Sequence, residues 1–567
     1  NNVAVGNYAL DANTTADYNN AFGYQALSAN TTGTLNDAFG YVALVANTTG
    51  SHNTAIGGGA LDGNTTGSEN VAVGRDSLGV NSAGSANTAV GRAALGDGTG
   101  FSNNTAVGYH SLKANTTGTN NVAIGKGAAD ANTTGQSIVA IGKDAAGALQ
   151  SGGFTIAIGT EALLATTTGS QNVAVGHRAM KENTTGYNNA AVGHTAMDAN
   201  TTGIENAAYG NHALGSNTTG GYNCAIGSQA LSSNTTASNN VAMGYATLGN
   251  NTTGYQNAAV GVGALGYNTT GNTNAAFGNT ALARSTTAGS NTAVGYGTMF
   301  ETTTGSVNTA VGTYAMYDNT TGQYNSCLGE ASLRKSTTAN HNSALGYRTL
   351  FENTTGINNT AVGSQALYNN TTGDKNVAVG ANALNDNTTA DDNTAIGYSA
   401  ASALDTGHKN TLIGAYAGTN GNSVHFNENV AVGYNAMANV VDSGDNTAVG
   451  FESGMTDNGG LNTTVGFKAG RGNHSIHLTA IGSNAGLNNN SWPNTFIGHN
   501  SGGVSADITG ERNTAVGNDS LRAVTSGHTN TAVGHNTLYA ATTVSNGTAI
   551  GAYALDAATT AGNCTAV

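Results

Sequence analysis

The chain has 567 residues, of which 83 are glycine, one is proline and only 8% are charged. This composition is typical of a repeat protein and unlike that of a string of ordinary globular domains. The formal net charge of −14 is spread thinly, and lysine and arginine form no basic run, so we expect no nucleic-acid partner. No stretch of about 18 apolar residues is present, so we expect no membrane span in this sequence.

One phrase of seventeen residues repeats along the chain. Its clearest mark is a glycine after two apolar residues, found at Gly6, Gly23 and Gly40 and then at every seventeenth residue to Gly414. From there to Gly551 the spacing varies between 16 and 19 residues. We call this glycine position zero of its coil. The spacing predicts a regular segment over residues 1–414 and an irregular continuation of the same repeat over residues 415–567.

The short period predicts a β-solenoid. Helical-hairpin repeats and propeller blades have periods of about 33 to 50 residues, and the phrase Asn53–Gly57 alternates as a strand does and contains threonine and isoleucine. We therefore predict an all-β fold, a parallel β-solenoid with about 33 coils of 17 residues. Each coil should hold two short strands, one before position zero and one around a pair such as Ala60-Leu61, with NTTG as the return bend.

Three columns of the repeat carry structural predictions. An asparagine stands four residues before position zero in nearly every coil, Ile138, Thr155, Leu478 and Gly547 being exceptions, and stacked amides can form a hydrogen-bonded ladder. Position zero is always glycine, which predicts positive φ or close backbone approach there. The NTTG glycine is less strictly required, because alanine replaces it at Ala16, Ala237, Ala288, Ala339 and Ala390.

The two residues before position zero are both apolar nearly everywhere, as in Ala4-Val5 and Ala123-Ile124. Neighbours on a strand face opposite sides, so one column can line the coil interior together with leucines such as Leu27. The other column then forms an apolar stripe on the outside. Such a stripe predicts that another chain packs against it.

The phrases NNVAVGNYAL, NNVAIGKGA and NTAVGYGTM resemble the N-x-V-A-[IV]-G-x-x-A/S repeat of the YadA-like head of trimeric autotransporter adhesins. They are also similar to the NTAVG repeats of phage tail fibres and bacterial surface fibres. The resemblance implies a left-handed β-roll, association of three chains, and a location outside the cell, at the cell surface or on a virion tail fibre. The NTTG insertion departs from the family pattern and lengthens the coil.

The NTT triplet matches the Asn-x-Thr acceptor motif of N-linked glycosylation. The alternative is that asparagine and threonine are there to build a turn, which Thr166, Ser285, Thr302 and Ser336 in place of the asparagine favour. The candidate acceptors are Asn13, Asn30, Asn47, Asn64, Asn115, Asn132, Asn183, Asn200, Asn217, Asn234, Asn251, Asn268, Asn319, Asn353, Asn370 and Asn387.

Catalytic and metal-binding patterns are missing from the sequence. Cys224, Cys327 and Cys564 are far apart and show no ligand spacing, and His177 and His194 repeat in consecutive coils without a third ligand. We therefore expect no enzyme, no cofactor and no metal site. The irregular segment contains Trp492-Pro493 and several histidines, including His425, His474, His477 and His499. These residues mark either a binding loop or a diverged spacer.

These patterns predict an extracellular structural fibre or fibril shaft that adheres or is displayed on a surface. Its expected partners are copies of itself, as a trimer or an end-to-end filament, and also a carbohydrate or a host-surface receptor. The absence of recognisable capping coils favours a filament or a longer array. An ice- or surface-binding solenoid is the alternative, because Thr14, Thr31, Thr48 and Thr65 form a regular file of hydroxyl groups.

Overall fold

The computed structural model describes residues 1–420, 426–456, 459–472, 474–504, 507–560 and 562–567. These residues form 34 short strands joined by turns and bends, and no helix occurs among them. The chain divides into unit 1, Asn1–Ala288, and unit 2, Gly289–Val567. The change of spacing after Gly414 therefore lies inside unit 2.

Unit 1 contributes one three-residue strand from each coil. Its strands are β1 (Val3–Val5), β2 (Asn20–Phe22), β3 (Asp37–Phe39), β4 (Thr54–Ile56), β5 (Val71–Val73), β6 (Thr88–Val90), β7 (Thr105–Val107), β8 (Val122–Ile124), β9 (Val139–Ile141), β10 (Ile156–Ile158), β11 (Val173–Val175), β12 (Ala190–Val192), β13 (Ala207–Tyr209), β14 (Cys224–Ile226), β15 (Val241–Met243), β16 (Ala258–Val260) and β17 (Ala275–Phe277).

Unit 2 is built in the same way. Its strands are β18 (Thr292–Val294), β19 (Thr309–Val311), β20 (Ser326–Leu328), β21 (Ser343–Leu345), β22 (Thr360–Val362), β23 (Val377–Val379), β24 (Thr394–Ile396), β25 (Thr411–Ile413), β26 (Val430–Val432), β27 (Thr447–Val449), β28 (Thr463–Val465), β29 (Leu478–Ile481), β30 (Asn494–Ile497), β31 (Thr514–Val516), β32 (Thr531–Val533), β33 (Thr548–Ile550) and β34 (Thr565–Ala566).

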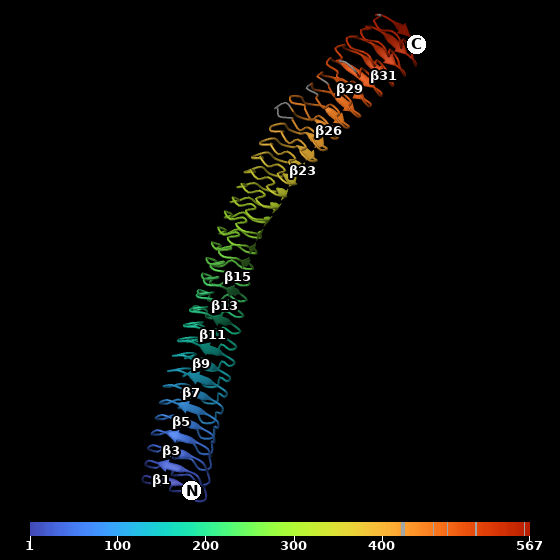
Figure 1. Cartoon of the computed structure of the whole chain (residues 1–567). Coiled ribbons are helices and arrows are strands. Elements are labelled where there is room, and N and C mark those ends of the chain that lie inside the picture. Colours follow the sequence, from blue (N-terminus) through green and yellow to red (C-terminus); the bar gives the residue numbers. More distant parts are fainter. Residues whose placement is uncertain (421–425, 457–458, 473, 505–506, 561) are drawn as a thin grey trace. The chain divides into compact units, whose positions relative to one another are not determined.

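Within each unit, every strand pairs in parallel with the corresponding strand of the next coil (Figure 1). The register is one full repeat, so Ala4 lies beside Ala21 and Ala21 lies beside Ala38. The predicted all-β, parallel β-solenoid is confirmed. The left hand implied by the resemblance stays a prediction.

The interior of a coil is filled by small and medium-sized side chains. Ala55 of β4 and Leu61 in the following turn are fully buried, and the same two columns are buried in nearly every coil. Ile56, next to Ala55 on the strand, is 43% exposed. The expectation that one apolar column faces inward and its neighbour faces outward is therefore confirmed.

The predicted second strand around Ala60-Leu61 is wrong, because both residues lie in turns. Leu61 has φ +51°, and Gly59 and Glu69 of the same coil are also left-handed. A left-handed residue cannot continue the pleat of a strand. The corner still bonds to the next coil, since the Leu61 amide donates to the Ser77 carbonyl at 2.9 Å.

The two glycine columns differ in the way that the alanine replacements predict. At position zero, Gly57 has φ +133°, and a Cβ there would lie 2.7 Å from the Gly74 carbonyl oxygen. The NTTG glycine Gly67 has no positive φ, although a Cβ there would also collide with the next coil. Position zero thus requires glycine for both conformation and space, whereas the NTTG position is restricted by space alone.

The substitution Gly125→Ala at position zero should destabilise the coil more than Gly118→Ala at the NTTG position. Gly125 has φ +136°, where a side chain costs roughly 1–3 kcal/mol in backbone strain alone, while alanine already occupies the NTTG column at Ala237. Chemical denaturation midpoints of the two variants measure the difference. Equal midpoints would show that positive φ is not the reason for glycine at position zero.

Candidate functional site

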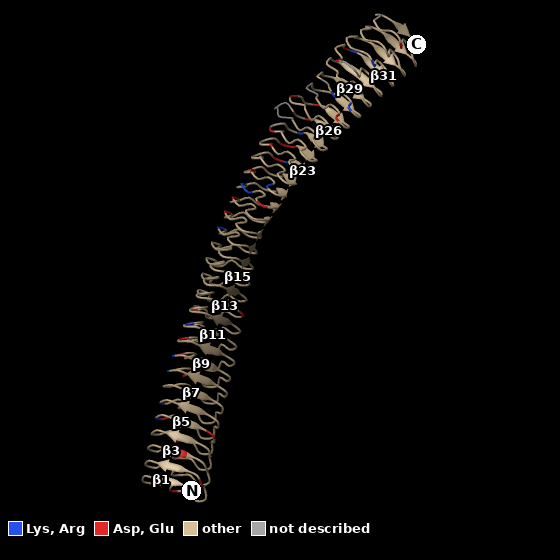
Figure 2. Cartoon of the chain, in the orientation of Figure 1, with Lys and Arg blue, Asp and Glu red and all other residues tan. Residues whose placement is uncertain are grey.

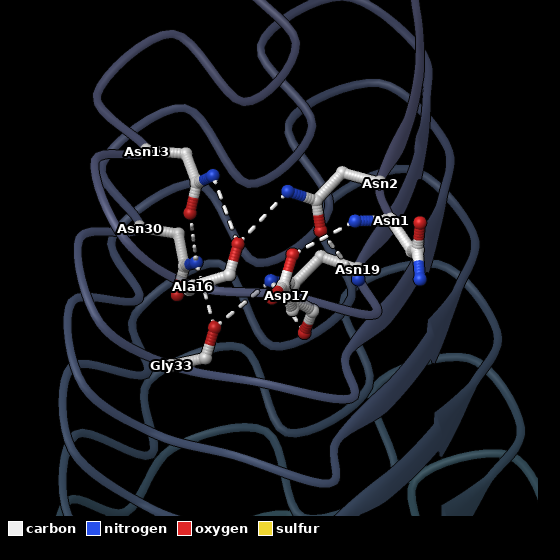
Figure 3. A network of polar contacts seen from close by, with 8 residues as sticks. All are labelled: Asn1, Asn2, Asn13, Ala16, Asp17, Asn19, Asn30 and Gly33. Carbon is white, nitrogen blue, oxygen red and sulfur yellow. Dashed lines mark hydrogen bonds and ion pairs between the residues drawn. The ribbon is translucent and has the colours of Figure 1, made fainter.

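Two columns of asparagine side chains meet inside each coil at the carbonyl of the NTTG bend. In one coil, Nδ2 of Asn19 and Nδ2 of Asn30 both donate to the Gly33 carbonyl at 2.9 Å, as Figure 3 shows. Asn19 and Asn30 are fully buried. We call the column of Asn19, four residues before position zero, the first asparagine column and that of Asn30 the second.

The first asparagine column forms the ladder that the sequence predicts. Nδ2 of Asn36 donates to Oδ1 of Asn19 at 3.1 Å, and the Asn36 backbone amide donates to the same oxygen at 3.0 Å. Where Ile138 interrupts the column, its backbone amide still donates to Oδ1 of Asn121 at 2.9 Å. The side-chain ladder is lost there, but the bond from main chain to side chain is kept.

The second asparagine column forms another ladder, which the sequence analysis did not predict. Nδ2 of Asn47 donates to Oδ1 of Asn30 at 2.8 Å and to the Gly50 carbonyl at 2.9 Å. Nδ2 of Asn64 repeats both bonds one coil on. These asparagines are therefore interior groups that clamp the bend from inside.

All sixteen candidate glycosylation sites lie in the second column. Asn13 is partly buried and the other fifteen are fully buried. In each of the sixteen, Nδ2 donates to the carbonyl three residues further on. Because an N-linked sugar would attach to that nitrogen, this geometry supports the turn-building alternative. Glycosylation stays a prediction that requires these bonds to be broken.

The second ladder ends where another residue replaces the asparagine. Ser285, Ser336 and Leu404 occupy the column after Asn268, Asn319 and Asn387, and Oδ1 of each of these asparagines is buried without a hydrogen-bond partner among the described residues. A buried acceptor without a partner costs roughly 1–3 kcal/mol. Asn64 is an exception, because its Oδ1 also lacks a partner among the described residues although Asn81 follows it in the column.

The variant Asn200→Asp should be destabilised by on the order of 2–4 kcal/mol. Nδ2 of Asn200 donates to Oδ1 of Asn183 at 2.9 Å and to the Gly203 carbonyl at 3.2 Å, so a carboxylate would face two oxygen atoms. Asn200→Ser is the matched control, because serine occupies this column at Ser285. Denaturation at neutral pH measures both variants, and an aspartate variant as stable as the serine variant would refute the buried ladder.

The residue directly before position zero forms an apolar column that we call the outer stripe. In unit 1 it includes Ile56 and Ile124, which are 43% and 40% exposed, and in unit 2 it includes Leu328 and Leu345, which are 50% and 46% exposed. Around Ser326 and Ser343, the stripe of unit 2 contains a shallow hollow of about 450 Å³. Charged residues are sparse in both units (Figure 2).

The threonines named for ice binding use their hydroxyl groups within the solenoid. Oγ1 of Thr48 donates to the Thr65 carbonyl at 3.0 Å, and Thr14, Thr31 and Thr65 donate to the next coil in the same way. In the coils of Thr31, Thr48 and Thr65 the following threonine, such as Thr49, is the exposed one, whereas Thr14 is itself exposed. The free hydroxyl file is therefore one residue further along than the sequence analysis placed it.

Two coils of unit 1 contain the same pair of neighbouring carboxylates. Asp62 lies near Asp76 of the next coil, and Asp130 lies near Asp144. Burial, followed by repulsion from the neighbouring carboxylate, raises the pKa of Asp62 and of Asp130. An acid whose pKa is raised by folding destabilises the folded state while it is ionised, and this penalty disappears as the pH falls below its unfolded pKa of about 3.9.

The double variant Asp62→Asn, Asp130→Asn should therefore unfold at a higher denaturant concentration than the natural chain at pH 7. Its advantage should vanish when the pH falls below about 4, because the natural carboxyls are then neutral in both states. Asp11→Asn is the control, since Asp11 is an exposed carboxylate in the same column. Denaturation midpoints at several pH values test this, and a pH-independent difference would contradict it.

No metal-binding or thiol site emerges from the geometry. Cys327 is buried, and burial raises the pKa of its thiol to about 12. His177 and His194 stack with their ring centroids 5.2 Å apart. In the described part of the chain, no group of three or more histidine, cysteine, aspartate or glutamate residues lies close enough to hold a metal ion.

Most of the histidines named in the irregular segment lie on the surface, and so does Trp492. His474, His477, His499 and Trp492 are exposed, while His425 lies outside the described residues. Among the described residues, no helix is long and apolar enough to cross a membrane.

Comparison with protein-family models finds no matching family, and comparison with curated proteins finds no matching sequence. The resemblance of NNVAIGKGA and related phrases to YadA-like head repeats therefore stays a prediction.

Proposed function

We propose that this chain is the shaft of an extracellular structural fibre, and that copies of it associate side by side along the outer stripe. The observation that supports this proposal is the partly exposed apolar column before position zero, which recurs in coil after coil of each unit. Isolated exposed apolar residues are ordinary, but a continuous exposed apolar surface marks an interaction site.

The energetics favour association because the same small gain is repeated many times. Full burial of an isoleucine or leucine side chain stabilises by about 1.5–3 kcal/mol, and Ile56 and Leu345 are still 43% and 46% exposed. Burial of the remainder would add roughly 1 kcal/mol in a coil with such a residue. Summed over many coils, this gain exceeds an association cost of about 4–15 kcal/mol.

An adhesive or surface-displayed role fits this architecture. Every coil supplies the edge on which the next one is built, so the solenoid holds its outer side chains in fixed columns. A carbohydrate or a host-surface receptor is the partner class that we propose for such columns. A three-chain arrangement is the side-by-side form that we propose, and an end-to-end filament is the alternative form of self-association.

Ice or surface binding is a second proposal, supported by the exposed threonine file that includes Thr32, Thr49 and Thr66. The geometry gives it less support, because the hydroxyl groups of the preceding threonines donate hydrogen bonds to backbone carbonyls of the next coil. Thermal hysteresis and ice-crystal shaping by the purified chain test this second proposal.

Sedimentation of the full chain tests self-association. We expect the natural chain to sediment as a multimer and the combined variant Ile56→Thr, Ile124→Thr, Ile226→Thr, Ile396→Thr to shift strongly toward single chains. The matched control is Tyr245→Thr, Tyr296→Thr, Tyr347→Thr, because these tyrosines are exposed outside the stripe, and it should remain multimeric. A natural chain that is monomeric at micromolar concentration would refute the proposal.

A further inference from the structure

Phe154 of unit 1 is held on the surface of its coil with a free ring. Its side chain is 62% exposed, more than any other phenylalanine of the described residues. Many other exposed rings stack on one another, such as those of Tyr24 and Tyr41. In the described part of the chain, no aromatic or cationic group packs on the Phe154 ring, so both of its faces are available.

The backbone presents this ring at an energetic cost. Phe154 has φ +55°, a left-handed conformation that costs a residue with a side chain roughly 1 kcal/mol. Its amide donates to the Gln136 carbonyl at 3.0 Å, which fixes it above the preceding coil. Most of the ring stays in contact with solvent, so the coil gains less from packing it than from a buried phenylalanine such as Phe101.

A hollow of about 380 Å³ opens beside the ring. Gly153 also lines it, between Gln136 and Ser170 of the two neighbouring coils, and adds no side chain there. The side chains of Gln136, Ser151, Ser170 and Gln171 make no hydrogen bond to any other residue in the described range 1–420. The hollow is lined by Phe154, Gln136, Gln171, Ser151, Ser170 and Thr134.

The face around the hollow carries no charge. From Ser82 to Asn188, the eighth, ninth, eleventh and twelfth residues after position zero are all uncharged, and most are threonine, serine, asparagine or glutamine. A phosphate, sulfate or carboxylate ligand would find no cationic partner here. A purely apolar ligand would leave the two glutamine amides and the serine hydroxyls unpaired.

We propose that this hollow binds a neutral saccharide. The C–H face of one pyranose ring would lie on the Phe154 ring, because a sugar ring presents apolar C–H groups that pack on an aromatic face. The Gln136 and Gln171 amides both donate and accept, as sugar hydroxyls do, and Ser151 and Ser170 complete the polar rim. The site does not depend on self-association along the outer stripe, because none of the residues that line the hollow belongs to that stripe.

Titration of the full chain with four neutral tetrasaccharides tests this site: cellotetraose, β-1,4-galactotetraose, β-1,4-mannotetraose and chitotetraose. We expect at least one to bind, observed by saturation-transfer NMR. Phe154→Gly should weaken that binding roughly tenfold or more through loss of the apolar contact. Glycine accepts positive φ, so this variant keeps its backbone. Gln171→Ala should weaken binding as well.

Tyr222→Gly is the matched control. Tyr222 occupies the same place in its own coil, is 53% exposed, has φ +59° and also follows a glycine. Its replacement should leave binding unchanged. Binding of none of the four sugars, or equal binding by the natural chain and Phe154→Gly, would overturn the proposal. Either result would leave the sedimentation of the chain, and therefore the fibre proposal, untouched.

Discussion

The buried asparagine amides constrain the rest of this structure. A primary amide has two N–H donors and a carbonyl acceptor, and burying them is costly unless they find hydrogen-bond partners in the interior. In the second column, Nδ2 of Asn47 bonds both the bend of its own coil and Oδ1 of Asn30 in the coil before. The bond to Oδ1 of Asn30 forms only when consecutive coils are aligned residue for residue.

The rest of the coil follows from this alignment. Alanine at positions such as Ala55 lets the strand approach the opposite corner, and Leu61 fills the space that remains. A core built in most coils from two alanines and one leucine, such as Ala55, Ala60 and Leu61, leaves no room for the larger residue before position zero. Ile56 and its equivalents are therefore outside, and the apolar surface that underlies the fibre proposal is a by-product of a narrow interior.

Strict spacing also limits where the surface can vary. The corner residues repeat at fixed positions. The surface of one coil can therefore differ from that of the next only in its outward-facing side chains, or where glycine leaves a side chain out. Gly153 and Phe154 are such a local change, in a coil where Leu149 and Thr155 also replace the usual asparagines. The carboxylate pairs at Asp62 and Asp130 are another, and they show that a coil tolerates some electrostatic cost at its surface.

Much of the fold could be predicted from the sequence because each column has its own physical requirement. The invariant glycine, the first asparagine ladder and the inward alanine all follow from spacing and residue type. The second strand was wrong because φ at Leu61 cannot be inferred from β-like composition. The second ladder was missed, although Leu149 and Leu404 occupy the NTT asparagine column and leucine there indicates an interior position.

The candidate surfaces were less predictable. The apolar stripe follows from alternation alone, whereas the hollow at Phe154 depends on side chains from three successive coils. Only the structure shows which of them are unpaired.

A high-resolution cryo-EM map of the native particle tests the central claim most directly. The account predicts continuous side-chain density between successive asparagines in both columns, including Asn200 and Asn217, with no sugar density at the NTT bends. Outward-pointing asparagines that carry glycan density at those bends would contradict it.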